Sequence, residues 1–522
     1  MLAGCATQGQ TGTAEGGGKA SWMPNLSSVP FVTGKGEKAT LISDLKPGAY
    51  DASSLAIGEQ KDLAQRRADG LGFVRTAPLE QYLGELQRHL LAVSTVTGVP
   101  GRVTILANPA FAASSTPDGN VYVAMGWFKY LDSADEVAAI VAHELAHVLL
   151  THHSSDIMAE MQHRGHALHE VAISAKTSLS GSKTATKGDA RGLTQGQLIA
   201  DATDKLILPA WNRRQEREAD LLAVDLLVRA EYSPIAMLSM LEKLKTWEDL
   251  HKQAEDDFWA RLADTARTDT GQAMNMAYQK VLNVVSVSHP KTVERIDDIA
   301  QYIDRHYGDK ALPELRPAPW KTVVARPDVA EVIRNYEAAF QAKKALDAGK
   351  PQDAYGHART AATGRTATHA YPNWVLARAA AALNRAPEAV TALQRAIGST
   401  DPVPQIYEDL IAVYEQAGNV GTALAWTDKA SEVFAGAPRW RPVKIRLLRK
   451  AGRTAEAEGL TLDCSVNTPD WRRLCQEANQ TAAAGKVAPA PSVAPKPAPP
   501  ATLPKVTAPK PTPPALTLPR RR

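Results

Sequence analysis

The sequence predicts a mostly helical α+β protein with two folded domains and an extended C-terminal tail. A strongly patterned helix spans residues 133–150, small residues recur about every 34 positions after residue 327, and prolines crowd the last 36 residues. A chain of 522 residues is longer than one compact domain. Hydrophobic residues at 44% exclude wholesale disorder. No apolar run reaches eighteen residues, so an integral membrane protein is not expected.

The charge balance argues against nucleic acid as a partner. The chain has 60 basic and 56 acidic residues, but seven basic residues and no acid lie from Gly485 onward. The body of the chain therefore carries 53 basic against 56 acidic residues. Binding of phosphate backbones needs a clustered cationic face, which this balance does not favour.

Residues 1–21 are interpreted as a lipobox-like terminus and a flexible tether. Leu2-Ala3-Gly4-Cys5 resembles the lipobox of bacterial lipoproteins, in which the cysteine carries the lipid. Small residues follow to Ser21, a composition typical of flexible linkers. Only four residues precede Cys5, so this hypothesis of a lipid anchor requires a start upstream or a trimmed chain. The alternative is a chance cysteine in a ragged terminus.

The first folded domain is expected over residues 22–310. Ser133 and Glu136 form a capping-box signature, and apolar residues then recur at helical spacing to residue 150. Strands are predicted at 103–107 and 120–124, and further helices at 81–93, 214–230, 234–247 and 292–307.

The strongest chemical signal is His143-Glu144-Leu145-Ala146-His147 inside the capped helix. Residues four apart share a helical face, so both imidazoles can bind one ion, and imidazole is a good zinc ligand. Glu144 lies beside them, where it can reach an activated water. A catalytic zinc needs a third protein ligand. Glu216 and Asp220, also four apart on a second amphipathic helix, are the candidates: Glu216 to bind metal and Asp220 to orient a histidine ligand.

Residues 327–480 are predicted to form a second, repetitive helical domain. Gly349, Asn384, Gly418 and Gly452 recur at intervals of 34 or 35, and each is followed five residues later by alanine. This period resembles tetratricopeptide repeats, which stack into an α-solenoid. A nonrepeating helical bundle is the alternative.

Two segments complete the chain. Cys464 and Cys475 either pair in an oxidising compartment or remain free thiols in a reducing one. Residues 485–522 are predicted to be a disordered tail rich in Pro, Ala and Lys, with 12 prolines after residue 486.

Three ordered motifs together resemble the HtpX/BepA group of zinc metallopeptidases, the family that includes the CAAX prenyl proteases. They are residues 126–152 (GWFKYLDSADEVAAIVAHELAHVLLTH), residues 214–223 (RQEREADLLA), and His289-Pro290 with Arg295-Ile296. The resemblance implies a gluzincin-type domain in which His143, His147 and Glu216 bind zinc and Glu144 is the catalytic base. Asp220 would then accept a hydrogen bond from a histidine ligand and orient it. The repeats indicate the soluble periplasmic branch of the family.

His289 is a separate expectation. The corresponding histidine of similar proteins lies near the zinc, so His289 would either act as an inhibitory fourth ligand or stabilise the oxyanion. The alternative is a histidine at a helix start. Between the motifs, His163, His166 and His169 depart from the family pattern, and Asn108-Pro109-Ala110-Phe111 only loosely matches a family signature. For the three histidines, a solvated helix face is favoured over metal binding.

The expected function is zinc-dependent endoproteolysis of unfolded or misassembled proteins in periplasmic and outer-membrane quality control. The substrate is expected to lie extended beside the strand at 120–124, and the repeats to dock clients or the outer-membrane assembly machinery. The alternative is a repeat-based chaperone or assembly adaptor whose peptidase domain is latent or idle.

Overall fold

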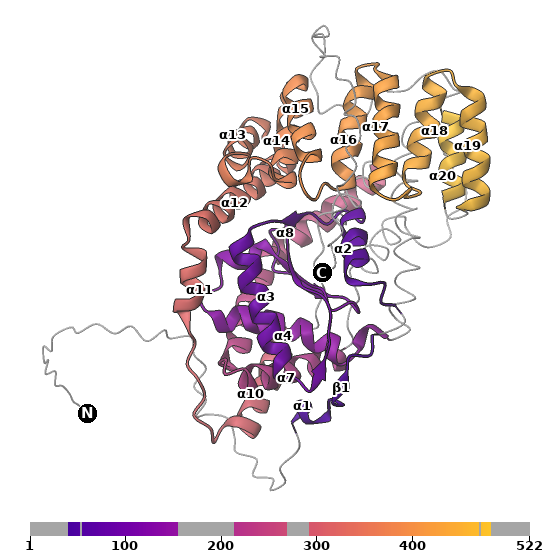
Figure 1. Ribbon diagram of the computed structural model, residues 1–522. Helices are drawn as coiled ribbons and strands as arrows, with labels where there is room; N and C mark the ends of the chain where they lie inside the picture. The colour runs from indigo at the N-terminus through magenta and orange to yellow at the C-terminus, as the bar shows by residue number, and fades with distance from the viewer. Residues whose placement is uncertain (1–39, 53–54, 155–212, 269–291, 469–470, 482–522) are drawn as a thin grey trace, which may run out of the picture. The chain divides into compact units, whose positions relative to one another are not determined.

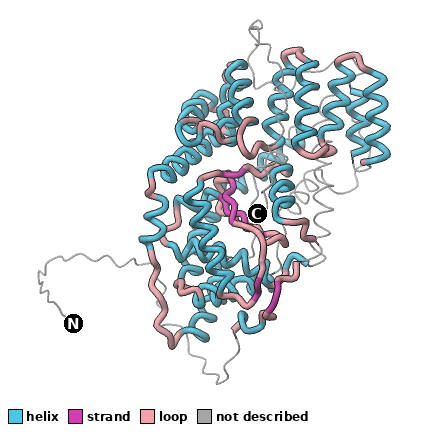
Figure 2. Tube along the Cα trace, viewed as in Figure 1, coloured by secondary structure: helices cyan, strands magenta, loops and turns pink. Residues whose placement is uncertain are grey.

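The computed structural model describes residues 40–52, 55–154, 213–268, 292–468 and 471–481. The predictions for Cys5, for His289 and for the histidines at 163, 166 and 169 lie outside these residues, as do those for the tether and the tail. The described part is mostly helical with two small sheets, which confirms the predicted α+β class (Figures 1 and 2).

The larger sheet has four strands in the order β2-β4-β6-β5. Their bounds are Phe73–Val74 for β2, Val103–Leu106 for β4, Val121–Ala124 for β6 and Ala113–Ser115 for β5. β4 and β6 run parallel, and β2 and β5 flank them antiparallel. A two-stranded parallel sheet pairs β1 (Gly48–Ala49) with β3 (Val96–Thr97).

This strand order corrects one expectation. The strand predicted at 120–124 is β6, and both of its edges are already paired, with β4 on one side and β5 on the other. It therefore has no main-chain groups left for an extended substrate. The outer strands of this sheet, among the described residues, are β2 and β5.

Helix α4 (Ala134–Leu149) is the centre of the first folded region, and every one of its residues is buried. Ser133 caps it: its side chain accepts from the Glu136 amide while Glu136 reaches back to the Ser133 amide. Helices α3 (Ala77–Ala92), α7 (Arg213–Arg229) and α8 (Ile235–Thr268) pack around it.

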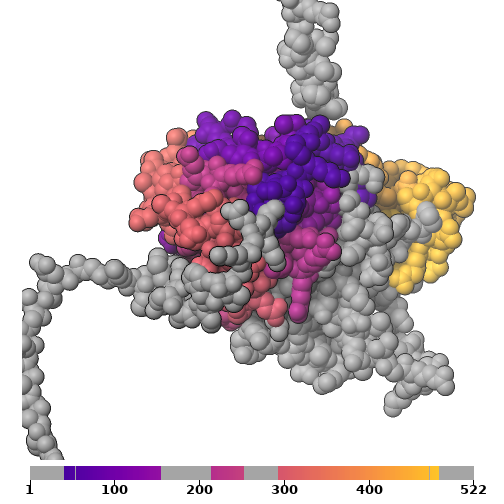
Figure 3. Space-filling model, turned by 90° about the horizontal axis from the view of Figure 1, so that it is seen from below, coloured from indigo at the N-terminus to yellow at the C-terminus, as the bar shows by residue number. Residues whose placement is uncertain are grey.

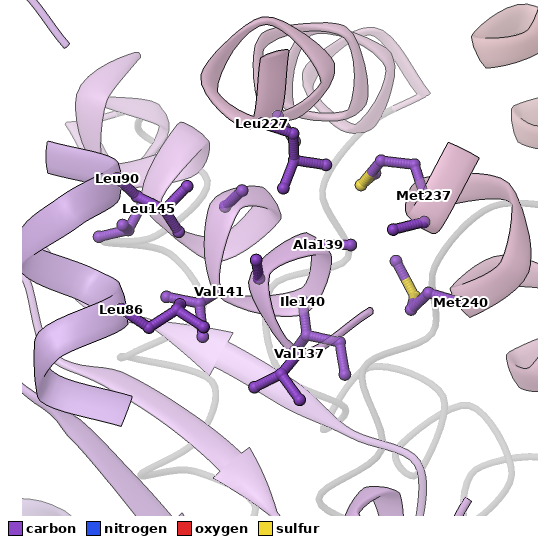
Figure 4. Packing of buried hydrophobic residues seen from close by; sticks show 14 of the residues in the cluster. Leu86, Leu90, Val137, Ala139, Ile140, Val141, Leu145, Leu227, Met237 and Met240 are labelled. Carbon is purple, nitrogen blue, oxygen red and sulfur yellow. The ribbon is translucent and has the colours of Figure 1, made fainter. Parts of the chain in front are cut away.

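The packing around α4 is visible in Figure 4. Leu86 and Leu90 reach it from α3, Leu227 from α7, and Met237 and Met240 from α8. Each such side chain, once buried, stabilises the fold by about 1.5–3 kcal/mol. Because α4 is otherwise apolar, its two histidines and three acids (Asp135, Glu136 and Glu144) are buried with it in the middle of the core.

Other elements complete this region. They are α1 (Leu41–Asp44), α2 (Glu59–Ala68), η2 (Met125–Lys129), η3 (His152–Ser154), α10 (Thr292–Tyr307) and α11 (Pro317–Val324). The hydrophobic core continues without a break through Trp320 of α11 to Val329 and Tyr336 of the next helix. Figure 3 shows residues from the N-terminal part, from α7 and α8, and from the helices after residue 292 side by side on one face.

The rest of the described chain is a succession of packed helices, seen as a row in Figure 1. They are α12 (Pro327–Asp347), α13 (Pro351–Ala361), α14 (Ala370–Ala382), α15 (Ala386–Ile397), α16 (Pro404–Gln416), α17 (Val420–Val433), α18 (Trp440–Lys450), α19 (Thr454–Asn467) and α20 (Arg472–Thr481). Their assignment as tetratricopeptide repeats stays a prediction.

The periodic small residues have a clear structural role. Gly349, Asn384, Gly418 and Gly452 lie in the turns between successive helices, and all have φ between +59° and +75°. Glycine and asparagine tolerate this left-handed conformation best. The alanine five residues after each of them is fully buried, which allows neighbouring helices to approach closely. A disulfide joins Cys464 of α19 to Cys475 of α20.

None of the helices in the ranges described above has the length and the apolar character that crossing a bilayer requires.

Candidate metal centre

Two imidazoles and one carboxylate converge in the core. The Nε2 atoms of His143 and His147 are 3.3 Å apart. Glu216 places Oε2 at 3.7 Å from the first and Oε1 at 3.6 Å from the second. Ligand atoms about 2.0–2.1 Å from a tetrahedral zinc ion lie about 3.3 Å from one another. Three buried donors within 4.8 Å, two nitrogen and one oxygen, therefore fit a zinc ion.

The secondary structure explains this convergence. α4 presents His143 and His147 one turn apart on one face, and α7 packs directly against α4. Glu216 lies in the first turn of α7 and is 1% exposed. Because both helices are anchored by long apolar runs, the three donors hold their places through the packing of the core.

A buried ion pair supports His143 from the side away from Glu216. Asp220 Oδ1 lies 3.0 Å from His143 Nδ1. Arg295 of α10 donates to both oxygens of Asp220, from Nε at 2.8 Å and from Nη2 at 2.7 Å. Its Nη1 is also 3.3 Å from Glu216 Oε2. One guanidinium thus holds two acids of α7 in place.

The electrostatics of this group follow from burial and pairing. Burial alone would raise the pKa of Asp220, but the Arg295 guanidinium outweighs burial and holds that pKa well below its usual range. Burial lowers the pKa of His143, and the contact with Asp220 more than reverses this, so the net pKa is raised. A proton on Nδ1 facing Asp220 leaves the Nε2 lone pair directed toward the metal position.

Glu144 shares a pocket with His143. The pocket is lined by both side chains and by apolar groups that include Phe111, Trp127 and Leu241. Glu144 itself is 2% exposed. Phe111 stacks on Trp127 with ring centroids 4.4 Å apart, so part of the pocket wall is aromatic.

The structure thus brings together five predicted site residues: His143, Glu144, His147, Glu216 and Asp220. It also shows two participants for which the sequence indicated no role. Arg295 belongs to the third motif, but its pairing with Asp220 spans 75 positions, and no local pattern indicates it. His152 is the last residue of the motif at 126–152, and its Nδ1 lies 3.0 Å from Nδ1 of His147, a contact that the motif does not indicate.

Comparison with known proteins agrees with this geometry. Residues 80–303 match Peptidase family M48, so the chain contains an M48 peptidase domain. Over 206 residues the chain is 26% identical to the Beta-barrel assembly-enhancing protease of Escherichia coli (strain K12), covering 38% of this chain and 40% of that protein.

Two further relatives are proteases by name. The Mitochondrial metalloendopeptidase OMA1 of Schizosaccharomyces pombe (strain 972 / ATCC 24843) is 25% identical over 171 residues, 33% of this chain and 45% of that protein. The Metalloprotease LoiP of Escherichia coli (strain K12) is 26% identical over 202 residues, 38% of this chain and 74% of that protein. The chain spans about two fifths of the length of the first of these relatives.

Proposed function

We propose that this chain is a zinc-dependent endopeptidase that cleaves unfolded or misassembled proteins. The observation that carries the proposal is the buried meeting of His143, His147 and Glu216 at ligand spacing, with Glu144 beside them in a pocket. The names of the three relatives support it.

Each residue of the site has its own role in the proposed reaction. His143, His147 and Glu216 would hold the zinc ion, which when bound polarises the scissile carbonyl and acidifies water. The Glu144 carboxylate accepts a proton from the attacking water and returns it to the nitrogen of the leaving amine. Asp220 and Arg295 keep the imidazole of His143 in the tautomer that leaves Nε2 free to bind.

The substrate is proposed to lie beside β5, which replaces the strand expected from the sequence. Among the residues that the structure describes, β5 pairs only with β6, and it packs next to α4, the helix of Glu144. An extended chain added there would be recognised through its main-chain groups and little through side chains. Recognition of this kind suits unfolded segments.

The proposed location is the periplasm. The disulfide between Cys464 and Cys475 supports an oxidising compartment. The E. coli relative is named for β-barrel assembly, which favours a role in outer-membrane protein quality control, with the helices after residue 327 docking clients or the assembly machinery. Anchoring through a lipid on Cys5 belongs to the same proposal.

The test uses the purified full chain and casein as an unfolded substrate. Glu144→Gln should bind zinc as wild type does yet lose cleavage by at least a hundredfold, because the amide cannot accept the proton. Glu216→Ala should lose bound zinc. Glu85→Gln, the same change on an exposed site of α3, is the control and should cleave normally.

Retained cleavage by Glu144→Gln would contradict the mechanism. If wild type does not cleave, or full rescue of a deletion strain is obtained with Glu144→Gln, the adaptor function expected as the alternative would be favoured instead.

A further inference from the structure

The second histidine ligand has its own support, and it differs from that of the first. His147 Nδ1 lies 3.0 Å from Nδ1 of His152, which is itself buried. On the other side of its ring, His152 Nε2 lies 3.4 Å from Glu218 Oε2. Glu218 is on α7 between Glu216 and Asp220. A line of three groups therefore runs from the proposed metal position through two imidazoles to a carboxylate.

A strained turn brings His152 to this position. α4 ends at Leu149, and Thr151 adopts φ +52° before the short helix η3 (His152–Ser154) begins. A β-branched residue in the left-handed region is unusual and costs free energy. Such conformations persist where the surrounding structure requires them and cluster at functional sites. Here the turn reverses the chain so that residue 152 contacts the helix it has just left.

The contact between the two Nδ1 atoms determines which ring nitrogens of His147 and His152 carry protons. Two ring nitrogens 3.0 Å apart attract each other only if one carries a proton and the other offers a lone pair. If His147 is to bind metal through Nε2, its proton must be on Nδ1, so His152 Nδ1 accepts. The proton of neutral His152 then lies on Nε2, facing the Glu218 carboxylate.

We propose that His152 is a positioning residue for the metal centre: it accepts the Nδ1 proton of His147 and, held by Glu218, fixes the tautomer and ring orientation of that ligand. The proposal rests on the zinc site of the proposed function and extends it. His152 is not a ligand, because its contact is with the edge of the His147 ring that faces away from Glu216.

The two proposed histidine ligands are supported by chemically different groups. His143 contacts a carboxylate directly, and that carboxylate is buried against Arg295. His147 contacts a neutral imidazole, and the carboxylate behind it is 31% exposed and shared with the exposed Arg214. The inner link between His152 and His147 should therefore matter more for metal affinity than the outer link to Glu218.

The experiment measures zinc affinity of the full chain by competition with a chromogenic chelator, together with the visible spectrum of bound Co²⁺. His152→Ala should weaken zinc binding about 10- to 100-fold. His152→Asn puts an amide where Nδ1 was and should stay within about threefold of wild type. His152→Gln puts its amide near the former Nε2, reaches only Glu218, and should resemble His152→Ala. Glu218→Gln should weaken binding a few-fold.

His153 provides the matched control. It is also buried, on the same short helix, and its ring contacts Ser115 of β5 at 3.4 Å. His153→Asn and His153→Gln should bind zinc as wild type does and leave the Co²⁺ spectrum unchanged.

The outcomes separate the two proposals. Absence of zinc binding in wild type would refute the metal site itself. Zinc binding by wild type with equal affinities for His152→Asn and His152→Gln, or equal losses at positions 152 and 153, would overturn the positioning role alone. The comparison of Asn with Gln also decides the matter if His152→Ala does not fold.

Discussion

The Asp220 carboxylate is buried beside the guanidinium of Arg295, which compensates its charge. The guanidinium makes two hydrogen bonds to it, and both side chains are almost inaccessible to solvent. Removing one partner of such a pair leaves the other charge uncompensated, and this costs about 3–5 kcal/mol. The pair therefore serves stability as well as ligand orientation.

Arg295→Met should accordingly lower the free energy of unfolding of the metal-free chain by about 3–5 kcal/mol, measured by urea denaturation. Arg217→Met is the control, since Arg217 pairs with Asp298 across the same two helices but at the exposed surface. Its loss should cost less than about 1 kcal/mol. Similar losses of unfolding free energy in both variants would show that the buried pair contributes no more to stability than the exposed pair does.

His153 gives the molecule an acid sensitivity that is independent of the metal ligands. Burial, followed by repulsion from His152 and Arg66, lowers the pKa of His153 to about 3. In the unfolded chain the pKa is about 6.5. The unfolded state alone takes up the proton between these values, so this contribution to stability is complete above pH 6.5 and is lost as the pH falls toward 3.

Between pH 7.5 and pH 5.5 wild type should therefore lose about 1 kcal/mol more of unfolding free energy than His153→Gln. Urea denaturation with a chelator present measures this without interference from bound metal. Parallel pH profiles for the two proteins would show that His153 is accessible to protons in the folded state.

At the scale of elements, the turns between the later helices depend on backbone conformation. Gly452 has φ +73° between α18 and α19, whereas Gly459 lies within α19, and an added Cβ at either glycine would meet no neighbouring atom. Only the backbone thus distinguishes the two sites.

Gly452→Ala should destabilise the chain by about 1 kcal/mol because alanine is strained at positive φ. Gly459→Ala should stabilise it by about 0.5–1 kcal/mol because alanine favours the helix. Thermal unfolding of the two variants measures both signs. A shift of the same sign in both would contradict the role assigned to the turn.

Local sequence signals predicted the elements that depend on local physics. The capping box and the apolar spacing predicted both ends of α4 to within one residue, and the ends of α7 and α10 were predicted equally well. β5 was missed because Ala-Ser-Ser has little strand preference and pairs only through its neighbour β6. α8 extends well beyond the predicted 234–247.

The site residues that could be predicted from the sequence are also those that depend on local spacing. His143, Glu144 and His147 follow from the spacing of one helix, and Glu216 and Asp220 from the spacing of another. Arg295 and His152 act through contacts that depend on how α10 and the turn at Thr151 are packed, which no spacing within one helix reveals.

At the scale of the whole molecule, the disulfide stabilises the far end of the described chain. Cys464 and Cys475 are 11 positions apart and join the last two helices. Closing so short a loop in the unfolded chain contributes about 3 kcal/mol.

C464A/C475A should therefore speed amide hydrogen exchange in α19 and α20, while the amides of α4 and the zinc affinity stay as in wild type. Wild type treated with reductant should behave like the double variant. Weakened zinc binding after loss of the disulfide would mean that the end of the chain and the metal centre are energetically coupled.

The complete burial of α4 has a consequence for genetics. The helix that carries Glu144, the proposed catalytic base, is also the one around which the first folded region is assembled. Random mutagenesis of this stretch should yield mostly collapsed or degraded products, and few folded but inactive ones. Clean loss-of-activity alleles should concentrate instead at Glu144, where an isosteric amide keeps the shape, and along the rim of the pocket.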